Sequence, residues 1–213
     1  MFRVSPWMAA CVAFVFSTAQ AAVVSTSGTA VFTDSPFPPE QDATIFVFDE
    51  QQGVAFDTDQ PLDFGAIAEG TLVNSHYVQF DPLTPSGEVS EGSITFDGAI
   101  LGVIVSTDNL NASVGGTTSD FYFGLSGDLG AYPTGNTPAA RGIGSPDDDL
   151  TIVLGSNTLV IKSLEIPGGS SAGNLDGIRV LTAAADPVPL PAAAPLFLAG
   201  LGALAARRRR ARA

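Results

Sequence analysis

Between Val23 and Ala183 the chain alternates short apolar runs with turn-forming residues, without the three-to-four-residue spacing of an amphipathic helix. Runs rich in Val, Ile, Phe and Thr that are bounded by Gly, Pro, Asn or Asp are typical of β-strands. The pattern therefore predicts many strands and almost no helix. The predicted strands cover residues 44–48, 53–56, 71–80, 93–96, 100–105, 121–125, 150–154, 158–166 and 177–182.

Three pairs of these runs are separated by short polar segments that predict hairpins. The connecting residues are Asp49–Gln52 in the first pair, Asp97-Gly98 in the second and Gly155–Asn157 in the third. An Asp-Gly pair between two apolar runs is a strong hairpin signal. The run Ile100–Val105 is apolar almost throughout, which predicts a central strand that is buried on both faces.

Together these elements predict an all-β fold, an antiparallel two-sheet sandwich over residues 22–183, with a jelly roll as one version of it. An up-and-down barrel is the alternative. We expect the sandwich to be flanked by an N-terminal signal helix and a short C-terminal hydrophobic helix. Both flanking elements follow from the two ends of the sequence.

Residues 1–21 have the pattern of a Sec-type signal peptide. Arg3 supplies a positive charge, residues 7–16 are apolar, and Ala19 and Ala21 give the small-x-small pattern of a cleavage site. We expect signal peptidase to cut after Ala21 and the following domain to be exported. Lipoprotein processing at Cys11 is a weaker alternative, because little apolar sequence precedes that residue.

A second apolar segment covers residues 192–206 and contains Pro195, Gly200 and Gly202. As a helix it would reach about 22 Å, whereas the hydrocarbon core of a bilayer is about 30 Å thick. The segment therefore predicts marginal, temporary insertion in the membrane. A basic cytoplasmic tail is expected at residues 207–213, because arginines stay on the cytoplasmic side. Its arginines are Arg207, Arg208, Arg209, Arg210 and Arg212.

Residues 184–191 form a linker that leads into a short motif. The motif consists of Val188, Pro189, Leu190, Pro191 and Ala192. With the apolar segment and the arginine cluster behind it, this motif resembles the VPLPA-CTERM sorting signal, a variant of the PEP-CTERM tail. The resemblance implies recognition and removal of the tail by an exosortase-like membrane protease. It also implies a Gram-negative bacterium that makes exopolysaccharide. The protein would pass through an inner-membrane intermediate to the cell surface or the extracellular space.

The charges are distributed unevenly along the chain. All 22 acidic residues lie between Asp34 and Asp186, and only three basic residues accompany them, so residues 22–186 carry a net charge of −19. A surface of this sign repels phosphate backbones and excludes nucleic acid as a partner, although it attracts divalent cations. The single cysteine, Cys11, lies in the signal peptide, so the mature domain has neither a disulfide nor a thiol nucleophile.

Candidate catalytic residues are few. His76 is the only histidine, and a hydroxyl nucleophile would need it as its base. The strand pattern around His76 instead predicts a side chain that pairs across a sheet or lines its surface. One histidine and no mature cysteine also disfavour a zinc site. Carboxylate pairs are plentiful, which keeps a glycoside hydrolase open as a hypothesis.

Two further groups of side chains are candidates for ligand binding. Tyr77, Tyr122 and Tyr132 are possible stacking rings for a sugar, although packing in the core is the more common role of tyrosine. Asp147, Asp148 and Asp149 follow each other before a predicted strand and could supply oxygen ligands to Ca²⁺. We expect no other cofactor.

The leading hypothesis is an exported, non-enzymatic protein of the cell surface or extracellular matrix. Its β domain would have a structural or adhesive role and would contact exopolysaccharide. A carbohydrate-binding module for exopolysaccharide is the second hypothesis, and a polysaccharide hydrolase is the third.

Overall fold

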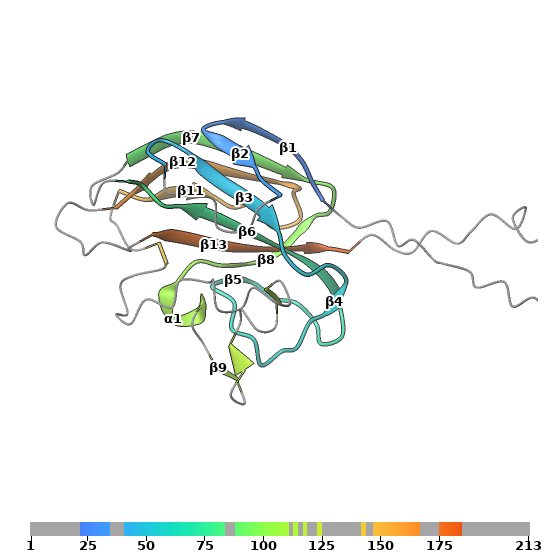
Figure 1. Ribbon diagram of the computed structural model, residues 1–213. Helices are drawn as coiled ribbons and strands as arrows, with labels where there is room; N and C mark the ends of the chain where they lie inside the picture. Colours follow the sequence, from blue (N-terminus) through green and yellow to red (C-terminus); the bar gives the residue numbers. More distant parts are fainter. Residues whose placement is uncertain are drawn as a thin grey trace, which may run out of the picture. The chain divides into compact units, whose positions relative to one another are not determined.

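Thirteen strands and one short helix make up the part of the chain that the computed structural model describes (Figure 1). These residues belong to one compact unit and fold as two facing sheets and a separate two-stranded pair, which confirms the predicted all-β sandwich. The predicted strand at 121–125 lies mostly outside them, and so do both predicted terminal helices. The described residues are 22–34, 41–83, 88–110, 113–114, 117–118, 123–124, 142–143, 147–166 and 175–184.

The smaller of the two sheets is antiparallel throughout. Its side chains alternate along β7 and β12, so that Ile94, Phe96 and Ile161 are buried while Val160 is partly exposed. Its strands in spatial order are β1 (Val23–Gly28), β7 (Glu88–Phe96), β12 (Thr158–Glu165) and β11 (Asp149–Thr151).

The larger sheet has seven strands, with the two long strands β6 and β13 at its centre. β2 and β3 pair in parallel, and the other pairs are antiparallel. β4 (Val54–Ala55) pairs β6 beside the main path. The main path in spatial order is β2 (Ala30–Phe32), β3 (Ile45–Asp49), β6 (Leu72–Phe80), β13 (Asp176–Ala183), β8 (Ile100–Ile104) and β5 (Phe64–Gly65).

The larger sheet is covered on both faces. On one face Val78, Ile178 and Val180 pack against Ile94 and Leu159 of the smaller sheet and form the main core. On the other face a second apolar cluster lies under the connecting segments that carry β4, β5 and the helix α1 (Thr107–Leu110) (Figure 1). Because β6 and β13 are central strands that are covered on both faces, nearly all of their residues are buried.

One carboxylate fixes this second layer in place. Asp63 accepts hydrogen bonds from the backbone amides of Val105 and Ser106, from Ser106 Oγ and from Asn109 Nδ2, at distances of 2.6–2.8 Å. Asp63 thereby satisfies two backbone donors just before α1 and ties the β5 segment to the helix, while Ser106 Oγ caps the helix by accepting the Asn109 amide at 3.3 Å. The separate pair of β9 (Ser113–Val114) and β10 (Thr117–Thr118) follows.

The predicted hairpin around residues 49–52 is wrong. β3 and β4 do not pair with each other, because both pair with β6: Asp49 lies opposite His76, and Val54 lies opposite Val73. Glu50 and Gln51 both stay hydrogen-bonded to Ser75 of β6, through Glu50 N to Ser75 O and Ser75 N to Gln51 O at 2.9 Å, so the residues between β3 and β4 form a bulge in one interrupted strand. Gly53, with a φ of 67°, donates its amide to Asn74 Oδ1 at 2.8 Å, which closes the bulge.

The predicted hairpin at Asp97-Gly98 is also wrong, because the chain there passes from one sheet to the other. β7 belongs to the four-stranded sheet, whereas β8 pairs with β13 in the larger one. A Cβ atom at Gly98 would lie 2.2 Å from the carbonyl oxygen of Ala183, so the close approach of β13 requires glycine here. The third predicted hairpin, around Gly155–Asn157, is confirmed by the pairing of β11 with β12.

The predicted burial of Ile100–Val105 is largely confirmed by β8. Ile100, Val103 and Ile104 are fully buried, and Leu101 is partly buried. The strand is not central, however, since only the two-residue strand β5 lies beyond it.

Candidate functional site

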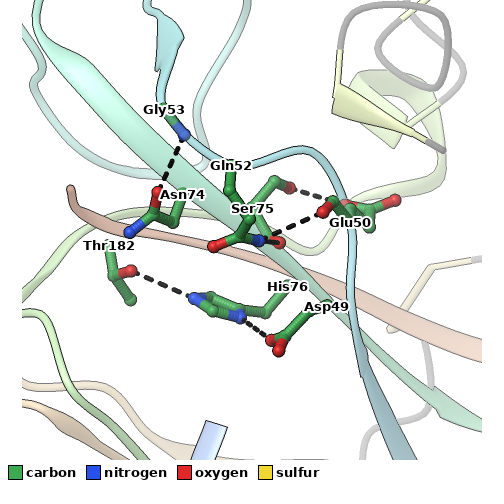
Figure 2. A network of polar contacts seen from close by, with 8 residues as sticks. All are labelled: Asp49, Glu50, Gln52, Gly53, Asn74, Ser75, His76 and Thr182. Carbon is green, nitrogen blue, oxygen red and sulfur yellow. Dashed lines mark hydrogen bonds and ion pairs between the residues drawn. The ribbon is translucent and has the colours of Figure 1, made fainter. Parts of the chain in front are cut away.

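The only histidine of the chain joins three strands of the larger sheet (Figure 2). His76 on β6 places Nδ1 2.6 Å from Asp49 Oδ1 at the end of β3 and Nε2 3.0 Å from Thr182 Oγ1 on β13. The His76 side chain is fully buried, whereas that of Asp49 is 24% exposed. The ring of Phe96 lies 4.6 Å from the imidazole, so His76 faces the smaller sheet.

Asp49, His76 and Thr182 thus form a series of carboxylate, imidazole and hydroxyl. Catalytic triads use the same series to activate a hydroxyl nucleophile. Here, however, the hydroxyl belongs to Thr182, which is fully buried, and Phe96 packs against the imidazole. A substrate has no access to Thr182 Oγ1 in this arrangement. The contacts instead cross-link β3, β6 and β13, in line with the expectation that His76 pairs across a sheet.

A buried ion pair occupies the opposite face of the same sheet. Glu50 follows Asp49 in the chain and accepts two hydrogen bonds of 2.8 Å from Arg179, Nε to Oε2 and Nη2 to Oε1. Ser75 Oγ donates a third to Oε2 at 2.5 Å (Figure 2). Both charged side chains have no exposed surface. Such two-pronged contact between guanidinium and carboxylate is the strong form of an ion pair.

Aromatic rings enclose this ion pair. Arg179 Cζ lies 5.4 Å from the centre of the Tyr77 ring and 5.8 Å from the centre of the Phe123 ring, within the range of cation–π attraction. Tyr77 is fully buried and packs against Phe48, with ring centres 5.6 Å apart. Tyr77 is therefore a core residue, the role that the sequence analysis favoured, and it cannot stack on a sugar. Tyr122 and Tyr132 lie outside the described residues.

The three consecutive aspartates contact three different groups of β12. Asp147 accepts a hydrogen bond on its backbone oxygen from Ser163 Oγ at 2.6 Å, and Asp148 Oδ1 accepts one from the Glu165 amide at 2.9 Å. Asp149 pairs with Lys162 at 3.0 Å, with both side chains about half exposed. Within the described part of the chain no group of three or more His, Cys, Asp or Glu side chains is arranged to hold a metal ion.

Two further carboxyl groups lie near these aspartates and have raised pKa values. A hydrogen bond with the Asp147 side chain raises the pKa of Glu165, with smaller contributions from desolvation and nearby charges. Burial of Asp176, reinforced by the charges of Asp148 and Glu165, raises its pKa to about 8. Asp176 is only 5% exposed, and its Oδ2 atom has no hydrogen-bond partner among the residues that the structure describes.

Asp147 and Glu165 do not have the spacing of the carboxyl pair of a glycoside hydrolase. The carboxyl pairs of such enzymes are separated by about 5–5.5 Å in retaining enzymes and by about 6.5–9.5 Å in inverting ones. Asp147 and Glu165 are hydrogen-bonded to each other, which leaves no room for a sugar between them. The pair therefore does not support the hydrolase hypothesis.

A shallow groove of about 420 Å³ lies on the outer face of the four-stranded sheet. Small side chains on β1 and β7 hollow this face, and Ser27 Oγ lies 2.7 Å from Ser93 Oγ at its floor. The neighbouring Thr95 and Thr158 hydroxyls are 3.4 Å apart, which continues a row of hydroxyl groups across the sheet. The groove is lined by Ser27, Gly28, Glu91, Gly92, Ser93, Val160, Ile161 and Lys162.

The residues predicted to direct export and sorting lie outside the described residues. They are Ala19 and Ala21 of the cleavage site, Val188, Pro189, Leu190, Pro191 and Ala192 of the motif, and Arg207, Arg208, Arg209, Arg210 and Arg212 of the tail. Across the described ranges, no helix is both long enough and apolar enough to span a membrane.

No family model, no curated protein sequence and no solved structure matches the chain. Function is therefore inferred from the residues and contacts described above.

Sequence reasoning missed the Glu50–Arg179 pair and the buried Asp176. Arg179 is one of only three basic residues between residues 22 and 186, and it lies inside a predicted apolar strand. A lone charge within a buried strand indicates a buried partner of opposite sign, and that signal could have been used. Nothing local pointed to Glu50, which is 129 residues away from Arg179 in the chain.

Proposed function

We propose that this chain is an exported, non-catalytic β-sandwich protein with a structural or adhesive role at the cell surface or in the extracellular matrix. Signal peptidase would remove residues 1–21, and an exosortase-like protease would act at the motif of residues 188–192. The membrane contact of residues 192–206 would be temporary.

The observation that carries the non-catalytic part of this proposal is the complete burial of the chain's only histidine. His76 has no exposed surface, and the hydroxyl that it contacts belongs to the fully buried Thr182. The other buried charges, Glu50 and Arg179, neutralise each other beneath a layer of connecting segments. The buried polar groups described above thus hold strands together, which supports a structural role.

The intact mass of the exported protein tests the route. The complete coding sequence is expressed in a Gram-negative bacterium that encodes an exosortase, and the protein is collected from the surface and the medium. We expect a mass that lacks residues 1–21 and the arginine tail. An Arg207→Ala/Arg208→Ala/Arg209→Ala/Arg210→Ala variant should accumulate with its tail uncut. Exported material that extends through Ala213 would contradict the proposal.

Contact with a polysaccharide is the second candidate function, and the groove on the four-stranded sheet favours it. Its hydroxyl groups at Ser27 and Ser93 can exchange hydrogen bonds with sugar hydroxyls. Because residues 22–186 carry a net charge of −19, a neutral polymer is favoured over an acidic one. A carbohydrate-binding module of this kind would bind through hydrogen bonds and without a described stacking ring.

Affinity electrophoresis with neutral and acidic exopolysaccharide fractions of the producing bacterium tests this second function. Ser93→Arg fills the groove, whereas Gln41→Arg adds the same charge at an exposed position outside it. We expect the neutral fraction to retard the wild type and Gln41→Arg, but not Ser93→Arg. Equal retardation of all three proteins would exclude the groove as the contact.

A further inference from the structure

β1 forms one edge of the four-stranded sheet. It pairs with β7 from Ser25 opposite Thr95 to Gly28 opposite Gly92, and the register shifts at Val24. Among the described strands, none pairs with the other side of β1. Alternate amide and carbonyl groups of Ser25–Gly28 therefore point away from the sheet, which makes this edge a template for another strand.

The remaining edges of the two sheets are short or charged. β11 at the opposite edge of the same sheet carries Asp149 in a salt bridge with Lys162 and directly follows Asp147 and Asp148. In the larger sheet the edge strands β2 and β5 have three and two residues. Charged residues and short strands are the usual protection of an edge against pairing. β1 has six residues and neither form of protection.

β1 also carries no charge, although the domain as a whole is strongly acidic. No charged residue occurs from Ala22 to Thr33, although residues 22–186 carry a net charge of −19. Val24 on this strand is 63% exposed, and Ser25 and Ser27 are exposed as well. Two copies of the domain repel each other over most of their surfaces but not along β1.

We propose that β1 pairs antiparallel with β1 of a second copy of this chain about a two-fold axis. The partner is the same chain because an uncharged edge meets an identical uncharged edge, and a two-fold contact needs only one self-complementary surface. Pairing joins two four-stranded sheets into one continuous sheet. The groove residues Ser27 and Gly28 lie on β1, so the two grooves come to lie across the axis from each other.

This pairing rests on the proposed function in one respect: cleavage after Ala21 leaves a single residue before β1, so that no leader covers the edge. It also has a defined salt dependence. Glu91 and Asp97 contact the two ends of the β1 region, through Thr29 N to Glu91 O at 3.1 Å and Asp97 N to Ala22 O at 3.2 Å. Each copy carries a net charge of −19 over residues 22–186, so added salt should screen the repulsion between the two copies and strengthen the dimer.

Sedimentation velocity of the exported protein tests the pairing, after its intact mass has shown whether residues 1–21 are gone. We expect a concentration-dependent dimer whose Kd falls as salt is raised. Ser25→Glu places like charges opposite each other across the axis and should weaken the dimer by about tenfold or more. Thr151→Glu adds the same charge on β11 and should leave the dimer unchanged.

Crosslinking keeps the test independent of any folding defect in Ser25→Glu. Ser27→Cys introduces the only cysteine of a chain from which residues 1–21 are removed, and short bifunctional maleimides should link it into dimers. Thr151→Cys should stay monomeric under the same conditions. A wild type that sediments as a monomer from micromolar to millimolar concentration, or equal crosslinking at both positions, would overturn the pairing. A retained leader would instead contradict the proposed route.

Discussion

The interior of the larger sheet and the outer face of the smaller sheet use polar residues in opposite ways. In the interior, Glu50, His76 and Arg179 are fully or almost fully buried, and each contacts a partner on another strand. On the outer face, Ser27 and Ser93 form only a short hydroxyl contact and border an open groove. Removing an interior partner should therefore lower the free energy of unfolding, whereas changing the outer face should alter only what the protein binds.

Asp176 differs from the ion pair within the interior, because its Oδ2 atom has no hydrogen-bond partner among the described residues. Glu50 lies against the Arg179 guanidinium, whereas the charged neighbours of Asp176 are the carboxylates Asp148 and Glu165. Burial without a cation favours the neutral acid. Ionisation of Asp176 is therefore unfavourable in the folded protein.

The largest effect is expected for Arg179→Met. It leaves the buried Glu50 carboxylate without its cation and should reduce the free energy of unfolding by about 3–5 kcal/mol. Urea denaturation followed by circular dichroism measures this loss. The double variant Glu50→Leu/Arg179→Met should recover most of the stability, because two apolar groups can replace a buried ion pair. Equal losses in the single and double variants would show that the ion pair is not the cause.

A gain of stability is expected for Asp176→Asn at neutral and alkaline pH. The folded state raises the pKa of Asp176 to about 8, so between pH 4 and 8 it binds more protons than the unfolded state. Wild-type stability should therefore fall as the pH rises through that window, by a few kcal/mol at most. Asp176→Asn should remove this decline. Unfolding curves that keep the same slope against pH would contradict the raised pKa.

A smaller loss is expected for His76→Leu, which leaves Thr182 Oγ1 buried without its partner. The cost of such a group is about 1–3 kcal/mol, and the partial exposure of Asp49 limits the cost at the other end. Thermal unfolding measures the shift. Thr182→Val removes only the hydroxyl and should cost less than His76→Leu. The reverse order would mean that the His76–Asp49 contact contributes little.

The smallest effect is expected for Lys162→Met on the outer face. Lys162 and Asp149 are both about half exposed, and pairs of this kind contribute at most about 1 kcal/mol. Urea midpoints of the variant and the wild type should nearly coincide. A loss as large as that of Arg179→Met would remove the distinction between the two regions.

The sequence was informative where strands are defined by local patterns. The runs that became β6, β12 and β13 were predicted within a few residues, because apolar side chains and flanking turn residues mark strands locally. The hairpin of β11 and β12 was predicted for the same reason. The choice of partner strands was harder to predict. An Asp-Gly pair marks a change of direction, but it does not say whether the next strand joins the same sheet.

The polar interior was not predicted because its contacts join residues far apart in the sequence. His76 meets Asp49 and Thr182 at separations of 27 and 106 residues, and no spacing rule connects them. The interruption between β3 and β4 likewise depends on Asn74 and Ser75, which lie on another strand. Asp176 lies one residue before the predicted strand 177–182, and its burial depends on how β13 packs.

The central claim is that the interior maintains the fold and that contacts with other molecules are made on the outer face of the four-stranded sheet. The most direct test of this claim uses the variants Ser93→Arg and His76→Leu. For each variant, both the unfolding midpoint and the retardation by the neutral exopolysaccharide fraction are measured. We expect Ser93→Arg to lose retardation with an unchanged midpoint, and His76→Leu to lose stability while its folded fraction is still retarded. Loss of retardation in folded His76→Leu, with Ser93→Arg unaffected, would contradict the claim.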